Sequence, residues 1–339
     1  MAVLTQKKFY IRLTIFLFLF LVSLVVAPII GSSHIDLKQV FDFQIPYSQN
    51  IAAQIFFSLR LPRVLMAGLT GATLALAGLV FQALLRNPLA DPFTLGVSSG
   101  AALGAVLAMK LGLVFSFFGF SSITIAAFIG ASLTIVIIFF ITSLKGGHFS
   151  TYSLILSGVS ISFFFSSIIL FIHYLADFTE THQMVRWIMG GVDIVNYDVL
   201  LRLTPFCLLG FSLVFLMSRQ LNLISMSEES AISRGVSVAK VQKVAFSTTS
   251  ILTGLVVAHS GPIGFVGLMV PHILRLVVGS DHRLLVPISI LFGATFLIFC
   301  DTIARIIIAP AEIPVGIVTA LFGGPFFIWL IFKKRKEFI

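Results

Sequence analysis

Charged side chains are scarce in this chain of 339 residues. Asp, Glu, Lys and Arg make up 10% of it, against about 25% in a typical soluble domain. Hydrophobic residues make up 58%, and the mean hydropathy is +1.10. No polar stretch is long enough for a separate soluble domain. The net charge of +9 is therefore not a sign of nucleic-acid binding, and residues 1–339 are expected to form a single membrane domain.

The sequence also lacks motifs that carry chemistry in many enzymes. It has no G-x-x-x-x-G-K-[ST] phosphate-binding loop and no H-E-x-x-H zinc motif. Its two cysteines, Cys207 and Cys300, lie in apolar runs and offer neither a disulfide framework nor metal-ligand spacing. We therefore expect no catalysis by this chain, and no metal or cofactor bound to it.

Long apolar runs dominate the sequence instead. They extend over roughly 17 to 25 residues, the length that crosses a hydrocarbon core about 30 Å thick. They predict an all-α, polytopic membrane protein with about ten transmembrane helices. The first run could be a signal peptide, but its length and Pro28 favour a first transmembrane helix. The predicted spans are 10–30, 63–85, 93–109, 120–143, 152–175, 199–218, 240–259, 263–278, 285–308 and 314–332.

Basic residues are distributed unequally between the two sets of loops. With both termini inside the cell, fifteen of the 22 Lys and Arg residues fall on the cytoplasmic side, as the positive-inside rule requires. The cytoplasmic set includes Lys145 and Lys336. The seven exceptions on the outer side need another explanation. They are Lys38, Arg60, Arg63, Lys110, Arg186, Arg202 and Arg305.

The segment 86–100 separates two apolar runs with a polar, proline-containing turn. Its prolines exclude an ordinary helix interior, and the glycines that follow give the next helix a face for close packing. A broken turn is costly in a bilayer unless protein or water surrounds it, so it indicates a transport path rather than a simple anchor. The candidate path residues are Asn87, Pro88, Asp91, Pro92, Gly96 and Gly100.

A second glycine- and proline-rich segment covers residues 261–275. Two of its glycines, Gly264 and Gly267, lie three residues apart at the start of a short predicted span. A helix of this composition packs tightly and breaks readily, which suits a moving gate. His272 in this segment is expected to be a hydrogen-bonded structural residue rather than a metal ligand.

The loop 219–239 contains strong helix signals. Ser225 and Glu228 have the spacing of a capping box. Gly235 can take the left-handed conformation that ends a helix, and Arg234 would face the negative end of its dipole. These signals predict a cytoplasmic helix over 226–234. Isolated helices of this length are marginal in water, so we expect it to dock on a partner. The alternative is a helix that lies passively on the membrane surface.

Charges near the outer side admit two interpretations. Arg60 and Arg63 could bind lipid phosphate, or they could pair with carboxylates in a two-pronged way. Asp301 and Arg305, four residues apart, share a helix face. They form either a structural pair or part of a translocation or docking site.

These motifs together resemble the FecCD family, the permease subunits of bacterial importers for iron–siderophore complexes, haem and cobalamin. The resemblance extends over nearly the whole chain, and its motifs occur in order. They are Arg60-Leu-Pro-Arg63, Gln82, Arg86 to Pro92, Leu95 to Ala101, Trp187 to Gly191, the loop 221–236, Gly261 to Gly267, Pro271 to Arg275, Asp301, Arg305, Glu312 to Gly316 and Gly323 to Phe327.

The resemblance implies a type II importer permease in a bacterial cytoplasmic membrane, paired with a second copy or a paralogue. Two cytoplasmic ATPases would bind ATP and Mg²⁺ and engage the loop helix. An extracytoplasmic binding protein would deliver cargo, and lipid surrounds the spans. The implied docking residues are Arg60, Arg63 and Arg305, and the implied ATPase-coupling residues are Ser225, Glu228, Glu229, Arg234 and Gly235. Here Ser227 stands before Glu-Glu, where the family commonly has Gly.

Two other classes of function remain as alternatives. A transporter driven by an ion gradient would need ionisable residues near mid-membrane, and only Asp301 and Arg305 come close. A membrane-embedded enzyme would need clustered His, Asp or Glu at one membrane face, and the sequence shows no such cluster. Iron chelates are the expected cargo, with haem and cobalamin as the alternatives.

Overall fold

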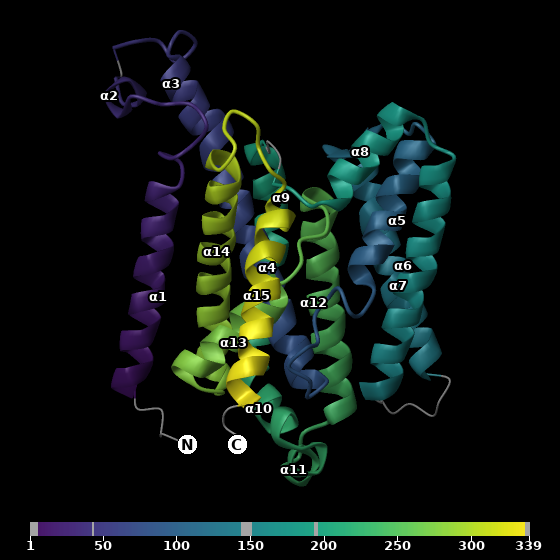
Figure 1. Ribbon diagram of the computed structural model, residues 1–339. Helices are drawn as coiled ribbons and strands as arrows, with labels where there is room; N and C mark the ends of the chain where they lie inside the picture. The colour runs from purple at the N-terminus through teal and green to yellow at the C-terminus, as the bar shows by residue number, and fades with distance from the viewer. Residues whose placement is uncertain (1–5, 43, 144–150, 193–195, 336–339) are drawn as a thin grey trace.

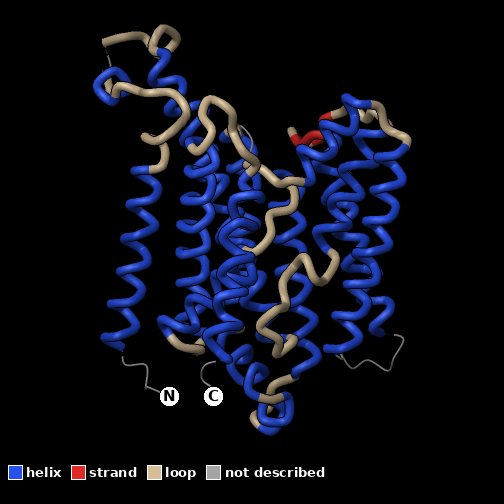
Figure 2. The backbone as a smooth tube through the Cα atoms, in the orientation of Figure 1, coloured by secondary structure: helices blue, strands red, loops and turns tan. Residues whose placement is uncertain are grey.

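The computed structural model describes residues 6–42, 44–143, 151–192 and 196–335, and helices account for most of them (Figure 1, Figure 2). Lys145 and Lys336, which entered the charge count, lie outside these residues. All ten predicted spans are confirmed as helices, with ends within four residues of those expected. They are α1 (Gln6–Val26), α4 (Leu61–Leu84), α5 (Val97–Lys110), α6 (Ser122–Ser143), α7 (Thr151–Tyr174), α9 (Tyr197–Leu216), α12 (Val238–Ser260), α13 (Val266–Val278), α14 (His282–Ile306) and α15 (Val315–Arg335).

Two of these helices are too short to cross a bilayer. Helices α5 and α13 have 14 and 13 residues, or about 20 Å at 1.5 Å per residue. Each begins inside one of the two glycine- and proline-rich segments, 86–100 and 261–275. The other eight are long and apolar enough to span a membrane. Irregular backbone therefore enters the bundle at two places.

The loops between the predicted spans contain short helices and a hairpin. Helix α2 (Leu37–Val40) precedes α3 (Ile51–Gln54), which continues through a π-helical turn, η1 (Ile55–Arg60), into α4. A hairpin of β1 (Ser116–Phe117) and β2 (Phe120–Ser121) joins α5 to α6. Helix α8 (Phe178–Ile188) begins at a capping box formed by Asp177 and Glu180. Helices α10 (Ser218–Met226) and α11 (Glu228–Ser233) lie in the loop before α12.

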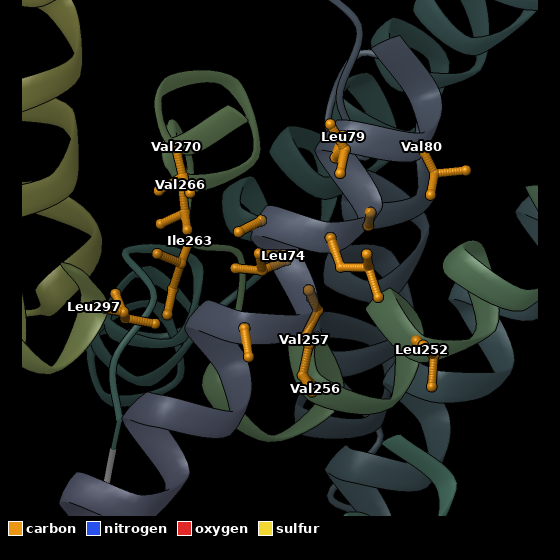
Figure 3. Close-up of a cluster of buried hydrophobic side chains, with 14 of the residues drawn as sticks. Leu74, Leu79, Val80, Leu252, Val256, Val257, Ile263, Val266, Val270 and Leu297 are labelled. Atoms are coloured by element: carbon orange, nitrogen blue, oxygen red, sulfur yellow. The ribbon is translucent and has the colours of Figure 1, made fainter. Parts of the chain in front are cut away.

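Helix α4 is the centre of the bundle. Nearly all of it is buried, and it packs on α14, α12, α13 and α9. Figure 3 draws Leu74 of α4 with Val257 of α12 and Ile263 of the α13 region, which belong to the same buried cluster. Helices α1, α7 and α15 are mostly exposed, as expected for helices that face lipid or another subunit.

The two ends of the bundle carry different elements. Helices α10 and α11 lie at the same end as the start of α1 and the end of α15, and α2, α3 and α8 lie at the other (Figure 1). We call these ends the α11 face and the α8 face. The expected topology requires the start of α1 and the end of α15 to lie on the same side as the 219–239 loop, and they lie at that end of the bundle. Which side of the membrane this is stays a prediction.

Candidate functional site

The two glycine- and proline-rich segments, 86–100 and 261–275, meet beside the last turns of α4. Gln82 of α4 donates a hydrogen bond from Nε2 to the backbone oxygen of Gly267 in α13 (3.0 Å). A Cβ atom on Gly267 would lie 3.0 Å from the Leu74 oxygen and 3.4 Å from Pro92. The backbones of α4 and α13 are thus in contact, with the Pro92 ring beside them, and a side chain at Gly267 would require these neighbours to shift. Pro92 and Gly267 were predicted as path residues separately, and the fold brings them together.

The turn between α4 and α5 is held by its own polar groups. Asn87 accepts a hydrogen bond from the Leu89 amide (3.0 Å). Asp91 is buried and accepts one from the Thr94 amide (2.8 Å). Arg86 has φ of 49°, a left-handed conformation that is rare for a residue with a side chain. Such strain persists where surrounding contacts enforce it, so this turn is a built feature of the fold.

The remaining predicted path residues lie in different surroundings. Pro88 lies in the same turn. Gly96 caps α5 with φ of 79°, and Gly100 packs its bare face on the backbone of Gly130 in α6. The expected close packing of this face is confirmed. Gly264 has open space where a Cβ would be, so steric packing does not require glycine there.

The segment Gly96-Val-Ser-Ser-Gly100 also has the G-x-S-x-G spacing of a hydrolase nucleophile. In the structure its central Ser98 lies in the first turn of α5 and is buried. Within the described residues, the Ser98 hydroxyl has no hydrogen-bond partner. An activated serine needs a base within hydrogen-bond reach, and the described residues place none beside Ser98.

The loop helix begins two residues later than its sequence signals predicted. The N-cap of α11 is Ser227, whose hydroxyl accepts a hydrogen bond from the Ser230 amide (3.0 Å). Ser225 belongs to the last turn of α10 and donates to the Asn222 oxygen (2.9 Å). The predicted capping box of Ser225 and Glu228 is therefore wrong, because the helix breaks at Ser227. The predicted stop is confirmed: Arg234 is the C-cap, and Gly235 follows with φ of 78°.

Two substitutions test these ends. Changing Ser227 to Ala is expected to destabilise α11 by about 1 kcal/mol, because an N-cap hydrogen bond is lost. Gly235→Val is expected to do more damage, because a β-branched residue tolerates positive φ badly. Ser225→Ala is the matched control and should have little effect. Protection of the 228–233 amides against hydrogen exchange measures all three. Equal protection in the Ser225 and Ser227 variants would contradict the cap assignment.

Charged contacts connect α11 and α10 to three spanning helices. Glu228 lies 3.2 Å from Arg86 at the end of α4 and 3.4 Å from the Gln242 amide of α12. Asn222 of α10 donates to Asp281 (2.8 Å), the N-cap of α14. Burial alone raises the pKa of Asp281, but hydrogen bonds from Arg283 and Asn222 outweigh it and lower the pKa to about 2. Polar contacts therefore connect this loop to the end of α4, to α12 and to the start of α14.

A buried charge cluster lies toward the α8 face. Asp301 is fully buried between Arg63 Nη2 (3.0 Å) and Arg305 Nε (3.1 Å). Arg305 Nε also donates to the backbone oxygen of Asp301 (3.4 Å), so the side-chain contact is mainly electrostatic. Arg63 has a second carboxylate partner, Glu312, at 2.5 Å. The cluster joins the starts of α4 and α15 to the end of α14.

Two of the three predicted docking arginines are buried. Arg60 and Arg305 are 6% and 3% exposed. Arg60 donates to the backbone oxygens of Pro28, Ile29 and Ser33, and Arg305 donates to those of Ala27 and Ile30. Both side chains thus hold the segment 27–33, which follows α1. Their docking role stays a prediction, and it now requires that a partner reach them past this segment.

Two adjoining cavities open near this cluster. One has a volume of about 670 Å³ and lies beside α8, the end of α12 and the start of α15. The other has about 580 Å³ and contains Arg60, Arg63, Arg186 and Arg305. Arg63, Arg186 and Glu312 line both. His182 and Trp187 of α8 and His259 of α12 line the first of these cavities. A local sequence pattern does not predict this grouping, because α8 and α12 lie far apart in the chain.

The fold and these contacts define a polytopic helical membrane protein in which two irregular segments enter the bundle and a helical loop lies on one face. The sequence profile of the FecCD transport family matches residues 15–333. The chain is similar to the hemin transport system permease protein HmuU of Yersinia pestis, with 40% identity covering 84% of each chain. It is also similar to the cobalamin import system permease protein BtuC of Halobacterium salinarum, with 38% identity covering 83% of this chain and 74% of that one.

A solved structure agrees with these sequence matches. It is described as an inward-facing conformation of a putative metal-chelate type ABC transporter. The two chains share 34% identity and a TM-score of 0.81, with 96% of this chain and 99% of that chain covered. The chain belongs to the FecCD transport family and is an ABC importer permease of that type. The predicted all-α, type II importer fold is confirmed.

Proposed function

We propose that this chain is the permease subunit of an ATP-driven importer that moves an iron(III)–siderophore complex across the cytoplasmic membrane. Haem and cobalamin are alternative cargoes of the same importer type. Two partner ATPases hydrolyse ATP with Mg²⁺, a second permease copy or a paralogue completes the path, and an extracytoplasmic protein delivers cargo. This chain binds no cofactor and performs no covalent chemistry.

One observation carries the proposal. Helix α11 is a short capped helix on the face that bears the start of α1 and the end of α15, and Glu228 at its start pairs with Arg86 at the broken turn. A partner that binds α11 can thus act on the turn directly. The family's importers hydrolyse ATP in separate subunits, and this chain contains no phosphate-binding loop of its own.

Uptake by vesicles reconstituted with the permease, its ATPase and its binding protein tests the function. ATP-dependent uptake should be blocked by vanadate and should survive an uncoupler. Uptake that stops with the uncoupler and ignores vanadate would favour a transporter driven by an ion gradient. Thermal-shift titration of the binding protein with ferric siderophores, haem and cobalamin identifies the cargo. A response to haem or cobalamin alone would replace the siderophore assignment.

The orientation has its own test. A cysteine at Ser227 on the α11 face, in a chain without Cys207 and Cys300, should be protected from an impermeant thiol reagent added outside the cell. Cysteines at Gln49 and Thr181, on loops of the α8 face, should react, because the charge distribution places that face outside. Outside labelling at residue 227 and protection at 49 and 181 would reverse the orientation.

Docking at Arg63 predicts a gain as well as a loss. Glu312 is 41% exposed on its side chain and occupies one edge of the Arg63 guanidinium. Replacing Glu312 with Gln should tighten binding of the acidic partner by about fivefold, because a competing carboxylate is removed. Arg63→Gln should weaken it. Titration of the binding protein onto nanodiscs measures both. If Arg63 serves only to anchor lipid or to hold the fold, Glu312→Gln will leave the affinity unchanged.

A further inference from the structure

The cavity of about 670 Å³ on the α8 face is built by several parts of the chain. Its walls come from α8, from the end of α12 at His259 and from residues 312–315 before and at the start of α15. Met109 at the end of α5 contributes another wall. Small-molecule sites usually measure about 300–1,000 Å³. The size and the four separate walls are typical of a binding site rather than of a gap in one loop.

The lining combines cationic and aromatic groups with a polar atom that lacks a hydrogen-bond partner among the described residues. Arg63 and Arg186 supply guanidinium groups, and Trp187 supplies an indole. The Nδ1 atom of His259 lies 3.0 Å from the Leu255 carbonyl oxygen. Since a carbonyl can only accept, Nδ1 carries the proton and Nε2 keeps a lone pair. Within the described residues, this buried Nε2 has no hydrogen-bond partner.

The charge of the region selects anions. The two adjoining cavities are lined by four arginines and one glutamate, and Asp301 lies buried behind them. Among the described residues, four positive and two negative side chains give a formal net charge of +2, and Arg63, Arg186 and Glu312 belong to the larger cavity. Charges of one sign in a hollow with apolar walls focus the electrostatic field and raise the local concentration of oppositely charged solutes. A cation would meet the opposite effect.

We propose that this cavity is the first contact site for cargo and that it takes a metal chelate with net negative charge, such as a ferric complex with free carboxylates. The proposal rests on the importer function, because that function makes the face opposite α11 the receiving side. Arg186 binds a carboxylate of the chelate, Trp187 packs against its organic frame, and cationic chelates of the same metal are disfavoured.

The two tryptophans of the chain give a direct test. Trp187 lines the cavity, and Trp329 lies fourteen residues beyond Val315, the α15 residue at the cavity wall, or about 21 Å along the helix. Trp329→Phe leaves one reporter in the cavity, and Trp187→Phe leaves one remote from it. Both variants are titrated in nanodiscs with ferric citrate as the anionic probe and ferrioxamine B as the cationic one.

Ferric citrate should quench the tryptophan fluorescence of the Trp329→Phe protein in a saturable way. It should quench the fluorescence of the Trp187→Phe protein only a little. Its half-saturating concentration should be about tenfold below that of ferrioxamine B, and Arg186→Glu should raise it about tenfold through loss of a charge-assisted contact. Lys38→Glu, a charge reversal on α2, is the matched control and should not change it.

The competing results are distinct. Equal quenching of both single-tryptophan proteins, or equal affinity for both probes, overturns the proposed cargo site in the cavity, even if ATP-driven uptake is observed. Selective quenching in a protein that shows no ATP-driven uptake overturns the importer function and leaves the anion site standing. An Arg186→Glu protein that binds ferric citrate normally overturns the assignment of that residue.

Discussion

Replacing Asp301 with Ala is expected to lower the free energy of unfolding by about 3–5 kcal/mol, the usual effect of removing one partner from a buried ion pair. Asp301 is 0% exposed and lies between Arg63 and Arg305 at 3.0 and 3.1 Å. Its loss would leave two guanidinium groups near each other without their shared buried counter-charge. Thermal unfolding of the detergent-purified protein measures the effect, as a fall in the midpoint.

The matched control removes the other carboxylate on the same arginine. Glu312→Gln breaks the contact with Arg63 at 2.5 Å, but Glu312 is 41% exposed on its side chain. An exposed pair contributes about 0–1 kcal/mol, so this variant should unfold near the wild-type midpoint. If Asp301→Ala also unfolds there, the Asp301 cluster does not hold α4 and α14 together. A large loss in both variants would locate the stability in Arg63 itself.

The spans could be predicted because a bilayer imposes length and apolarity on any helix that crosses it. That constraint acts on the sequence alone, and all ten helices appear where the runs lie. It also explains why α5 and α13 could be located while their starts were predicted four and three residues too early, at 93 and 263 instead of Val97 and Val266. Their apolar residues continue into irregular backbone at 93–96 and 263–265, where protein surrounds the chain. A hydropathy pattern does not distinguish a buried turn from a helical one.

The cap of α11 shows where local signals become ambiguous. Ser225 and Ser227 both precede acidic residues, and each offers a hydroxyl to a following turn. The ion pair of Glu228 with Arg86 joins this loop to a residue 142 positions away, and a local pattern does not contain that contact. Helix α8 is a different case. Asp177 and Glu180 have capping-box spacing, but they lie between the predicted spans 152–175 and 199–218, and the span pattern predicts no helix there.

The burial of Arg60 and Arg305 could not be derived from the sequence. Their partners are mainly backbone carbonyl groups of residues 27–33, and every residue type has a carbonyl. The positive-inside rule identified these arginines as exceptions that need a reason. A carbonyl-rich segment after α1 supplies one reason, and an acidic partner would supply another. The unusual position was predictable, but the physical partner was not.

The contacts at the end of α4 predict a route from α11 to the gate. Arg86 pairs with Glu228 (3.2 Å), and four residues earlier on α4 Gln82 bonds the Gly267 oxygen (3.0 Å). Arg275 donates to the Gln82 oxygen. One end of α4 therefore connects the α11 loop to α13. We expect Arg86 and Gln82 to be positioning residues that transmit movement of α11 to α13.

Charge reversal at Arg86 should uncouple the importer without unfolding it. Arg86 and Glu228 are 41% and 36% exposed on their side chains, so their pair adds little stability. Arg86→Glu would place two carboxylates together and push α11 away from α4. Uptake per ATP hydrolysed should fall about tenfold, within the 5- to 150-fold range of coupling between linked sites. Lys243→Glu, an exposed charge reversal on α12, is the control and should leave this ratio unchanged.

The exchanged pair separates a contact from two independent roles. In the double variant Arg86→Glu with Glu228→Arg, opposite charges face each other again, so uptake per ATP should recover at least in part. Gln82→Ala should lower the same ratio by another route, because the Gly267 oxygen and Arg275 lose a shared buried partner. Reconstituted vesicles give hydrolysis and uptake in one measurement. If the double variant loses as much uptake per ATP as Arg86→Glu alone, and both bind the ATPase as the wild type does, the pair does not transmit the movement.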